Sequence, residues 1–236
     1  NHGLMSQTGQ HQWFTVDGGS VQYVSRLGLA MTGKGVQIRL GCPINAVRRT
    51  DEGVEIRAEG GEWERFDEVI FATHSDVSLK LLSDVSDHEA KALGAIRFQP
   101  NDMVLHSDPS VMPKARKVWS SWCYAEGPQK SEDRIDLSYW MNSLQPWLKS
   151  DDLIVTLNTT RPIREDLIWD EATFHHPVFD AAALQAQQQI AALNGTNRTW
   201  FCGAWMKNGF HEDGISSAID VVEAIGGQPA LAVAAQ

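Results

Sequence analysis

The segment with the clearest capacity for chemistry lies near the carboxyl end, where TWFCGAWMKNGFHEDGISSAIDVVEAI occupies residues 199–225. A predicted strand ends there at two small residues, Gly203 and Ala204, and a loop leads into a predicted helix. Small residues allow a ligand to approach the backbone closely, and a helix start offers N–H groups without intrahelical partners. Because Glu212 and Asp213 already bring negative charge to this helix start, a ligand with partial or delocalised negative charge is favoured. An ordinary capped helix after a strand gives the same pattern, so both interpretations stay open.

A second candidate ligand site follows the apolar run Val69–Ala72, which is typical of a strand buried on both faces. The run ends in Ala72-Thr73-His74. Small residues at the carboxyl end of a buried strand mark the ligand-binding edge of layered α/β sheets. Any α/β core contains such a strand end, so this signal alone is not specific.

The patterns for hydrolysis and metal catalysis are incomplete. The sequence has no GxSxG nucleophile motif. His88-Glu89 and His211-Glu212 begin like HExxH, but Ala92 and Ile215 stand where the second histidines are required. The sequence therefore predicts no metal site.

Other polar residues have two interpretations each. His175-His176 could bind a metal or remove a proton, although a loop pair packed against the following helix is favoured. His211 is the better functional histidine, through its position in the turn before the last helix. Asp102, His106 and Asp108 share one face of a predicted strand, which a solvated edge explains about as well.

Four aromatic residues, Trp122, Tyr124, Tyr139 and Trp140, fall on strands that we expect to pair. They could form the wall of a cavity for an apolar or acyl substrate, or they could belong to the core of the sheet. Because successive strand residues point to opposite faces, Tyr139 and Trp140 cannot both line one pocket without a bulge.

The composition limits the classes of protein to consider. The chain has 236 residues, 20 Lys+Arg and 30 Asp+Glu, and 20 − 30 gives a net charge of −10. An acidic chain is a poor match for non-specific nucleic-acid binding, and no apolar run is long enough for a transmembrane helix. Three scattered cysteines predict a reducing compartment, the cytoplasm. The chain begins at Asn1 without the pattern of a signal peptide, and we expect it to continue from a longer polypeptide.

These candidate sites must be positioned by alternating helices and strands. Helices are predicted over Val21–Thr32, Val77–Leu82, Asp87–Leu93, Asp180–Asn194 and Ile215–Ile225. Strands are predicted over Val36–Leu40, Ile44–Arg49, Gly53–Ala58, Trp63–Thr73 and Thr199–Trp205, and an antiparallel sheet over Met103–His106, Val118–Tyr124, Leu137–Asn142 and Leu153–Asn158.

The order of GGS before a helix, INAVRRTDEGVEI, FDEVIFATHSD and FCGAWMKNGFHEDGI resembles the later part of flavin-containing amine oxidases and protoporphyrinogen-oxidase-like flavoproteins. The likeness is greatest to bacterial proteins described as predicted NAD/FAD-binding proteins. It covers roughly residues 13–227. The segments HSDPSVMP, WSSWCY, YWMNSLQ and HPVF are more specific than the general pattern.

The resemblance implies FAD as cofactor and a role for each matching position. Val47 would lie by the adenine, Ala72 and Thr73 near the adenosine and pyrophosphate, and Gly203 and Ala204 beside the ribityl-pyrophosphate. Phe210, His211 and Glu212 would form the turn under the isoalloxazine. Asp213 stands where these proteins usually have a small residue. We expect the space at Gly203 to belong to the ligand.

The resemblance implies an α/β fold, with a partial FAD/NAD(P)-binding domain of the Rossmann-like, glutathione-reductase type and an antiparallel-sheet substrate domain. The GxGxxG motif of the first βαβ unit is missing from the sequence. The expected division is an N-terminal segment at 1–17, an FAD-domain portion at 18–75 and 196–236, and a substrate domain at 76–195. The expected function is FAD-dependent oxidation of a small or lipid-like substrate by hydride transfer. The alternative is a non-catalytic binding module that has lost the cofactor.

Overall fold

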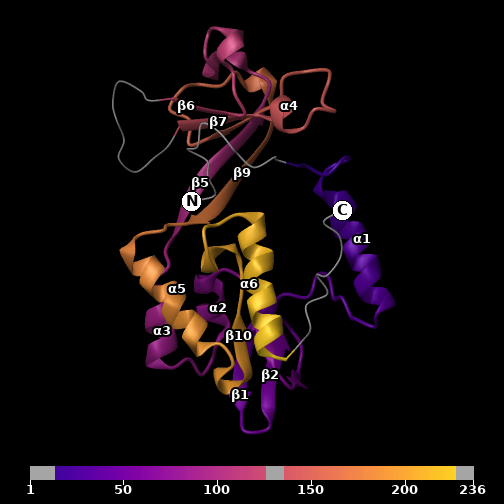
Figure 1. The fold of residues 1–236 in the computed structure, drawn as a ribbon, viewed down its shortest axis with the longest axis vertical. Coiled ribbons are helices and arrows are strands. Elements are labelled where there is room, and N and C mark those ends of the chain that lie inside the picture. Colours follow the sequence, from indigo (N-terminus) through magenta and orange to yellow (C-terminus); the bar gives the residue numbers. More distant parts are fainter. Residues whose placement is uncertain (1–13, 126–135, 227–236) are drawn as a thin grey trace. The chain divides into compact units, whose positions relative to one another are not determined.

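The computed structural model describes residues 14–125 and 136–226, and its helices and strands are drawn in Figure 1. The chain divides into two compact units. The first comprises Asn1–Ile38 and Pro100–His176, and the second comprises Arg39–Gln99 and Pro177–Gln236. The expected boundaries near residues 75 and 195 therefore fall inside the second unit. The helices at 75–94 and 181–193 pack with the strands that were expected to bind the cofactor.

Two small sheets form the second unit. Strands β1 (Ile44–Thr50), β2 (Gly53–Ala58) and β3 (Trp63–Phe66) pair antiparallel in that order. Strand β4 (Val69–Phe71) pairs parallel with β10 (Thr199–Phe201), so that Phe71 lies opposite Phe201. The long strand predicted over Trp63–Thr73 is thus two strands that belong to different sheets.

Four helices cover these strands: α2 (Ser75–Leu81), α3 (Asp87–Gly94), α5 (Ala181–Leu193) and α6 (His211–Ala224). Helix α3 packs against both α2 and α5, whose places are labelled in Figure 1, and α5 also contacts β10. Val47, Phe71, Leu93, Ile190 and Phe201 meet in one apolar core, and the rings of Phe71 and Phe201 stack with centroids 5.4 Å apart. This core fixes the ends of β4 and β10 relative to the helices.

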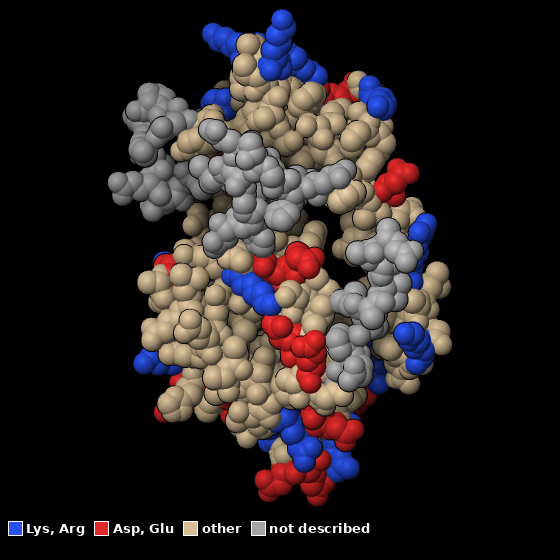
Figure 2. Space-filling view, viewed as in Figure 1, with Lys and Arg blue, Asp and Glu red and all other residues tan. Residues whose placement is uncertain are grey.

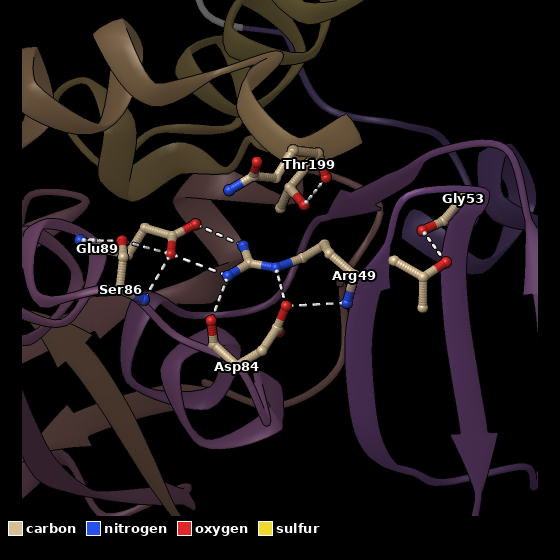
Figure 3. A network of polar contacts seen from close by, with 8 residues as sticks. Arg49, Gly53, Asp84, Ser86, Glu89 and Thr199 are labelled. Atoms are coloured by element: carbon tan, nitrogen blue, oxygen red, sulfur yellow. Dashed lines mark hydrogen bonds and ion pairs between the residues drawn. The ribbon is translucent and has the colours of Figure 1, made fainter.

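A buried ion pair joins β1 to α3. The Arg49 guanidinium donates to both carboxylate oxygens of Glu89, at 2.5 and 3.0 Å, and to Asp84 Oδ2 at 2.9 Å (Figure 3). The side chains of Arg49 and Glu89 are only 6% and 4% exposed. Glu89 also accepts the backbone N–H of Ser86 and so closes the capping box of α3.

The first unit contains a five-stranded sheet in the order β6-β7-β8-β5-β9. Its strands are β5 (Phe98–His106), β6 (Trp122–Ala125), β7 (Asp136–Trp140), β8 (Ile154–Leu157) and β9 (Ile168–Pro177). Helix α1 (Ser20–Gly33) and the short α4 (Met141–Leu144) belong to the same unit, and none of the residues of α1 is buried. None of the described helices is long and apolar enough to cross a membrane.

A chain of buried polar side chains crosses this sheet. His106, Ser138 and Thr156 are each 0% exposed. The Asp108 backbone N–H donates to His106 Nδ1 at 3.1 Å, so the ring proton is on Nε2, which lies 2.8 Å from Thr156 Oγ1. Thr156 Oγ1 lies 2.9 Å from Ser138 Oγ. Burial lowers the pKa of His106, although the Asp108 carboxylate opposes this shift. The structure thus holds a neutral histidine.

We expect His106 to make stability fall on acidification. Because its folded pKa is lowered, the unfolded chain binds more protons between the folded pKa and the ordinary value of about 6.5. Its contribution is therefore complete above that value and is lost as pH falls below it, by up to about 1.4 kcal/mol per pH unit. Urea unfolding at pH 7.5 and 5.5 should give a flatter pH dependence for His106→Asn than for the wild type, and equal slopes would contradict this.

Most predicted elements are confirmed. Besides the strand predicted over Trp63–Thr73, three predictions differ from the structure. Residues 36–40 form no strand, and Leu40 is 89% exposed. The apolar alternation is present, but none of the described strands pairs with this segment. His175-His176, predicted as a loop pair, lie in strand β9 at residues 168–177. Helix α6 also begins four residues earlier than predicted, at His211.

Charges of both signs alternate around the β1–β2 hairpin, at the bottom of Figure 2. Arg48 pairs with Glu55, and Arg65 pairs with Glu52. The Arg65 and Glu52 side chains are 61% and 77% exposed, so that pair contributes little to stability. The exposed pair of Arg65 and Glu52 provides a reference for the buried pair of Arg49 and Glu89.

Candidate functional site

The carboxyl ends of β4 and β10 lie side by side. The Cys202 N–H donates to the Phe71 carbonyl at 3.0 Å and continues the parallel pairing one residue beyond the strands. Ala72 and Thr73 follow β4 and are exposed, while Gly203 and Ala204 follow β10 and are half-buried. We call these four residues the strand-end edge. The structure brings the two candidate segments of the sequence together at the position where α/β sheets bind ligands.

Trp205 packs beneath the strand-end edge and joins its two halves. Its indole N–H donates to the Thr73 carbonyl at 3.0 Å, and the residue is 3% exposed. Gly203 has a φ of 150°, and a Cβ built on it would lie 2.6 Å from Trp205 Nε1. The expectation that the space at Gly203 belongs to a ligand is therefore wrong, because the indole of Trp205 fills it.

Ser217 connects α6 to the same edge by hydrogen bonds. Its hydroxyl accepts the Gly203 N–H at 2.9 Å and lies 2.8 Å from the Gly214 carbonyl, to which it donates. Asp213, Ser217 and Val221 are buried at spacings of four residues and form the inner stripe of α6. Trp205 and Ser217 are not among the residues that the sequence predicts for the site. A polar residue inside the buried stripe of a helix is the signal that could have identified Ser217.

Helix α6 begins beside this edge with Phe210 as N-cap. The Asp213 carboxylate is 5% exposed and accepts the Phe210 N–H at 2.9 Å, so Asp213 caps the helix from inside and does not face solvent. Phe210, His211 and Glu212 are exposed. The first-turn N–H groups lack carbonyl partners within the helix and carry the positive end of its dipole, which the two carboxylates offset.

Val47 belongs to the same unit but lies in its core. It is 2% exposed, and its carbonyl accepts the Ser83 N–H at 2.8 Å. A backbone contact from Val47 to an adenine would have to use another group or replace this hydrogen bond.

A cavity of about 620 Å³ opens next to β10, between α5 and α6. Trp200, Phe201, Met206 and Ser217 are among its lining residues. Lys207 also lines it and pairs with Asp220 at 2.9 Å. The cavity reaches the last residue of β10, although Trp205 fills the space beyond that strand end.

The four aromatic candidates lie in the first unit, on two faces of its sheet. Trp122 pairs with Tyr139 across β6 and β7, and their rings meet edge to face with centroids 6.4 Å apart. Tyr124, two residues along β6, shares that face. Trp140 lies on the other face, against Trp119. One pocket can therefore include Trp122, Tyr124 and Tyr139 but not Trp140. Burial raises the pKa of Tyr139, which keeps its hydroxyl protonated.

The remaining polar candidates have structural partners. Asp102 accepts a hydrogen bond from Thr173, and His176 Nδ1 lies 2.9 Å from Asn101 Nδ2. Glu89, from the first HExxH-like segment, holds Arg49. Among residues 14–125 and 136–226, no group of three or more His, Cys, Asp or Glu side chains could hold a metal ion.

Comparison with known proteins gives a family and a fold. A family model described as flavin containing amine oxidoreductase matches residues 2–152. No curated protein sequence matches the chain.

Two kinds of solved structure illustrate the fold. A fatty acid isomerase from P. acnes that produces CLA is 15% identical over 78% of this chain and 47% of its own, with a TM-score of 0.54. A putrescine oxidase with redesigned cofactor binding is 12% identical over 89% of this chain and 52% of its own, with a TM-score of 0.57. The chain spans about half the length of each, and at these identities the likeness is one of fold alone.

Proposed function

The chain belongs to the family of flavin-containing amine oxidoreductases, and from this premise we propose that it forms part of an FAD-dependent oxidoreductase. The observation that carries the proposal is the strand-end edge, where two parallel strands end in small residues beside the first turn of α6. We further propose that the enzyme acts in the cytoplasm, in keeping with the free thiols of Cys42, Cys123 and Cys202.

The residues of the edge fit a flavin nucleotide in two respects. Ala72 and Thr73 are exposed and Ala204 is half-buried, so a ligand can reach small residues at the ends of both strands. Just beyond Thr73, the hydroxyl of Ser75 is fully buried and has no hydrogen-bond partner among the described residues. A buried hydroxyl without a partner supports the proposal that a polar group of the ligand forms a hydrogen bond with it.

The start of α6 fits the electron-accepting end of the cofactor. When bound, oxidised flavin would accept the hydride of the reaction, and the reduced form that results carries delocalised negative charge along its N1–C2=O edge. The backbone N–H groups of His211 and Glu212 would face that edge. The carboxylates of Glu212 and Asp213 disfavour a full anion, such as a pyrophosphate, at the same place. Ala72, Thr73 and Ala204 would lie beside the rest of the nucleotide, while Val47 and Gly203 would act only through the packing of the core and of Trp205.

For the substrate we propose a small or lipid-like molecule that binds the aromatic face of Trp122, Tyr124 and Tyr139. Rigid aromatic side chains give apolar contact at little entropic cost. The two similar structures are named for a fatty acid isomerase and a putrescine oxidase, so both acyl and amine substrates deserve testing. The 236 residues contain no GxGxxG clamp for the pyrophosphate, and we propose that polypeptide outside them supplies it.

We expect the product of the complete gene to carry flavin when it is purified. Its visible spectrum should show bound flavin, and anaerobic addition of substrate should bleach that absorption as hydride reaches the cofactor. The assay would compare a diamine with an unsaturated fatty acid. Bound flavin without bleaching by any substrate would favour a binding module without catalysis. A colourless protein that also fails to bind added FAD would reject the proposal.

A further inference from the structure

Strand β9 is an unusually open edge of the five-stranded sheet. Of the strands that the structure describes in this sheet, β9 stands at one end of the order, next to β5 alone (Figure 1). All eight residues from Trp169 to His176 are exposed, including Trp169 at 64% and Phe174 at 54%. An edge strand of ten residues with two exposed aromatic side chains is a template for pairing with another strand.

The sequence of β9, IWDEATFHHP, is complementary to itself when it is reversed. Acidic residues occupy one half, at Asp170 and Glu171, and the two histidines occupy the other half. We propose that β9 pairs antiparallel with β9 of a second copy of this chain, with the two-fold axis at Thr173. In this register, Glu171 of each copy lies opposite His175 of the other.

Neighbouring pairs support the same register. Asp170 falls opposite His176, and the small Ala172 falls opposite the large Phe174. Directly opposite residues lie on one face of a sheet and contribute most of the cross-strand energy. A carboxylate opposite an imidazole accepts a hydrogen bond from it, and a small residue opposite an aromatic ring leaves room for the ring.

A shift of one residue removes most of this complementarity. With the axis between Ala172 and Thr173, Glu171 falls opposite Phe174, and Trp169 falls opposite His176. Only Asp170 keeps a histidine partner, His175. Side-chain pairing therefore selects the register centred on Thr173.

A second copy explains the pattern better than an unrelated partner does, because an unrelated partner would not require β9 to complement itself. The interface would be small, consisting of two ten-residue strands, and each copy carries a net charge of −10. Small interfaces between like-charged chains are weak. Dimerisation should therefore depend on concentration.

Sedimentation equilibrium of the 236-residue chain tests the proposal. In a two-fold interface, Glu171→His creates two histidine pairs and His175→Glu creates two carboxylate pairs. We expect each single change to weaken the dimer about tenfold. The double variant Glu171→His with His175→Glu restores both mixed pairs with their positions exchanged, and should return to within about threefold of the wild type.

Glu62→His provides a matched control, since Glu62 is also an exposed carboxylate but lies outside β9. It should leave the dissociation constant unchanged. Circular dichroism would verify that all variants fold alike. A wild-type chain that stays monomeric as its concentration rises would overturn the proposal. So would a dimer that both single changes leave intact, or one that the double variant fails to restore.

Discussion

Replacing Arg49 by alanine should lower the free energy of unfolding by about 3–5 kcal/mol, because it leaves the Glu89 carboxylate buried without its cation. Glu89 is 3% exposed, and Arg49 donates to both of its oxygens (Figure 3). Ser86 would still donate to Glu89 through its backbone N–H and its hydroxyl. Among the described hydrogen-bond partners of Glu89, however, Arg49 is the only cation. We expect the loss to exceed that of any exposed ion pair in the chain.

Urea unfolding of Arg49→Ala and Arg65→Ala makes the matched comparison. Arg65 pairs with Glu52 at the surface, so its loss should change the free energy of unfolding by less than about 1 kcal/mol. A double variant, Arg49→Met with Glu89→Leu, should recover much of the loss, because it leaves no charge buried. If the two alanine variants lowered the free energy of unfolding equally, the ion pair of Arg49 and Glu89 would contribute no more than a surface pair, which would contradict this prediction.

The same ion pair should make the free energy of unfolding depend on pH in the acid range. Burial raises the pKa of Glu89, but hydrogen bonds from Arg49 and Ser86 outweigh this effect, and the net pKa lies below the ordinary value. Stability from a carboxylate with a lowered pKa is present above the unfolded pKa and is lost as pH falls through the folded one. This acid loss should therefore occur below that of His106 and be absent from the double variant.

Replacing Gly203 by alanine should lower the free energy of unfolding by about 2–4 kcal/mol. A φ of 150° is strained for any residue with a Cβ, and the new atom would lie 2.6 Å from Trp205 Nε1 and 2.9 Å from its Cδ1. The indole cannot move aside easily, because it is buried and hydrogen-bonded to the Thr73 carbonyl.

Gly214→Ala provides the control, since Gly214 lies in α6 and its added Cβ would be 3.7 Å from the nearest atom, an ordinary contact. Alanine is the better helix former, so this change should be neutral or stabilising by up to about 1 kcal/mol. Denaturant unfolding measures both variants. If Gly203→Ala were as stable as the wild type, the close packing of Trp205 over Gly203 would be wrong.

Local signals in the sequence were enough to predict several elements. Helix α5 begins after Asp180, whose carboxylate accepts the Ala183 N–H, and ends at Asn194 before Gly195, as the capping residues indicate. The end of β4 was recognisable because an apolar run stops at Ala72. Such features depend on neighbours within a few residues, which a sequence displays directly.

Long-range contacts could not be predicted in this way. Trp205 and Thr73 are 132 residues apart in sequence, and no local pattern links the indole to that carbonyl. Strand β9 was missed because both its faces are exposed, so it lacks the alternation that marks a half-buried strand. Residues 36–40 have that alternation, but no strand within 14–125 or 136–226 pairs with them. A strand depends on its neighbour, and a single sequence does not reveal which neighbour is present.

The most direct test of the central claim measures bound flavin per chain in Ala72→Leu, prepared in the product of the complete gene. Ala72 is exposed at the end of β4, so leucine would obstruct the strand-end edge without disturbing the core. Ala182→Leu, at another exposed position, in α5, is the control. The account predicts that the wild type and Ala182→Leu retain flavin while Ala72→Leu loses it and remains folded. Equal flavin content in all three proteins would contradict it.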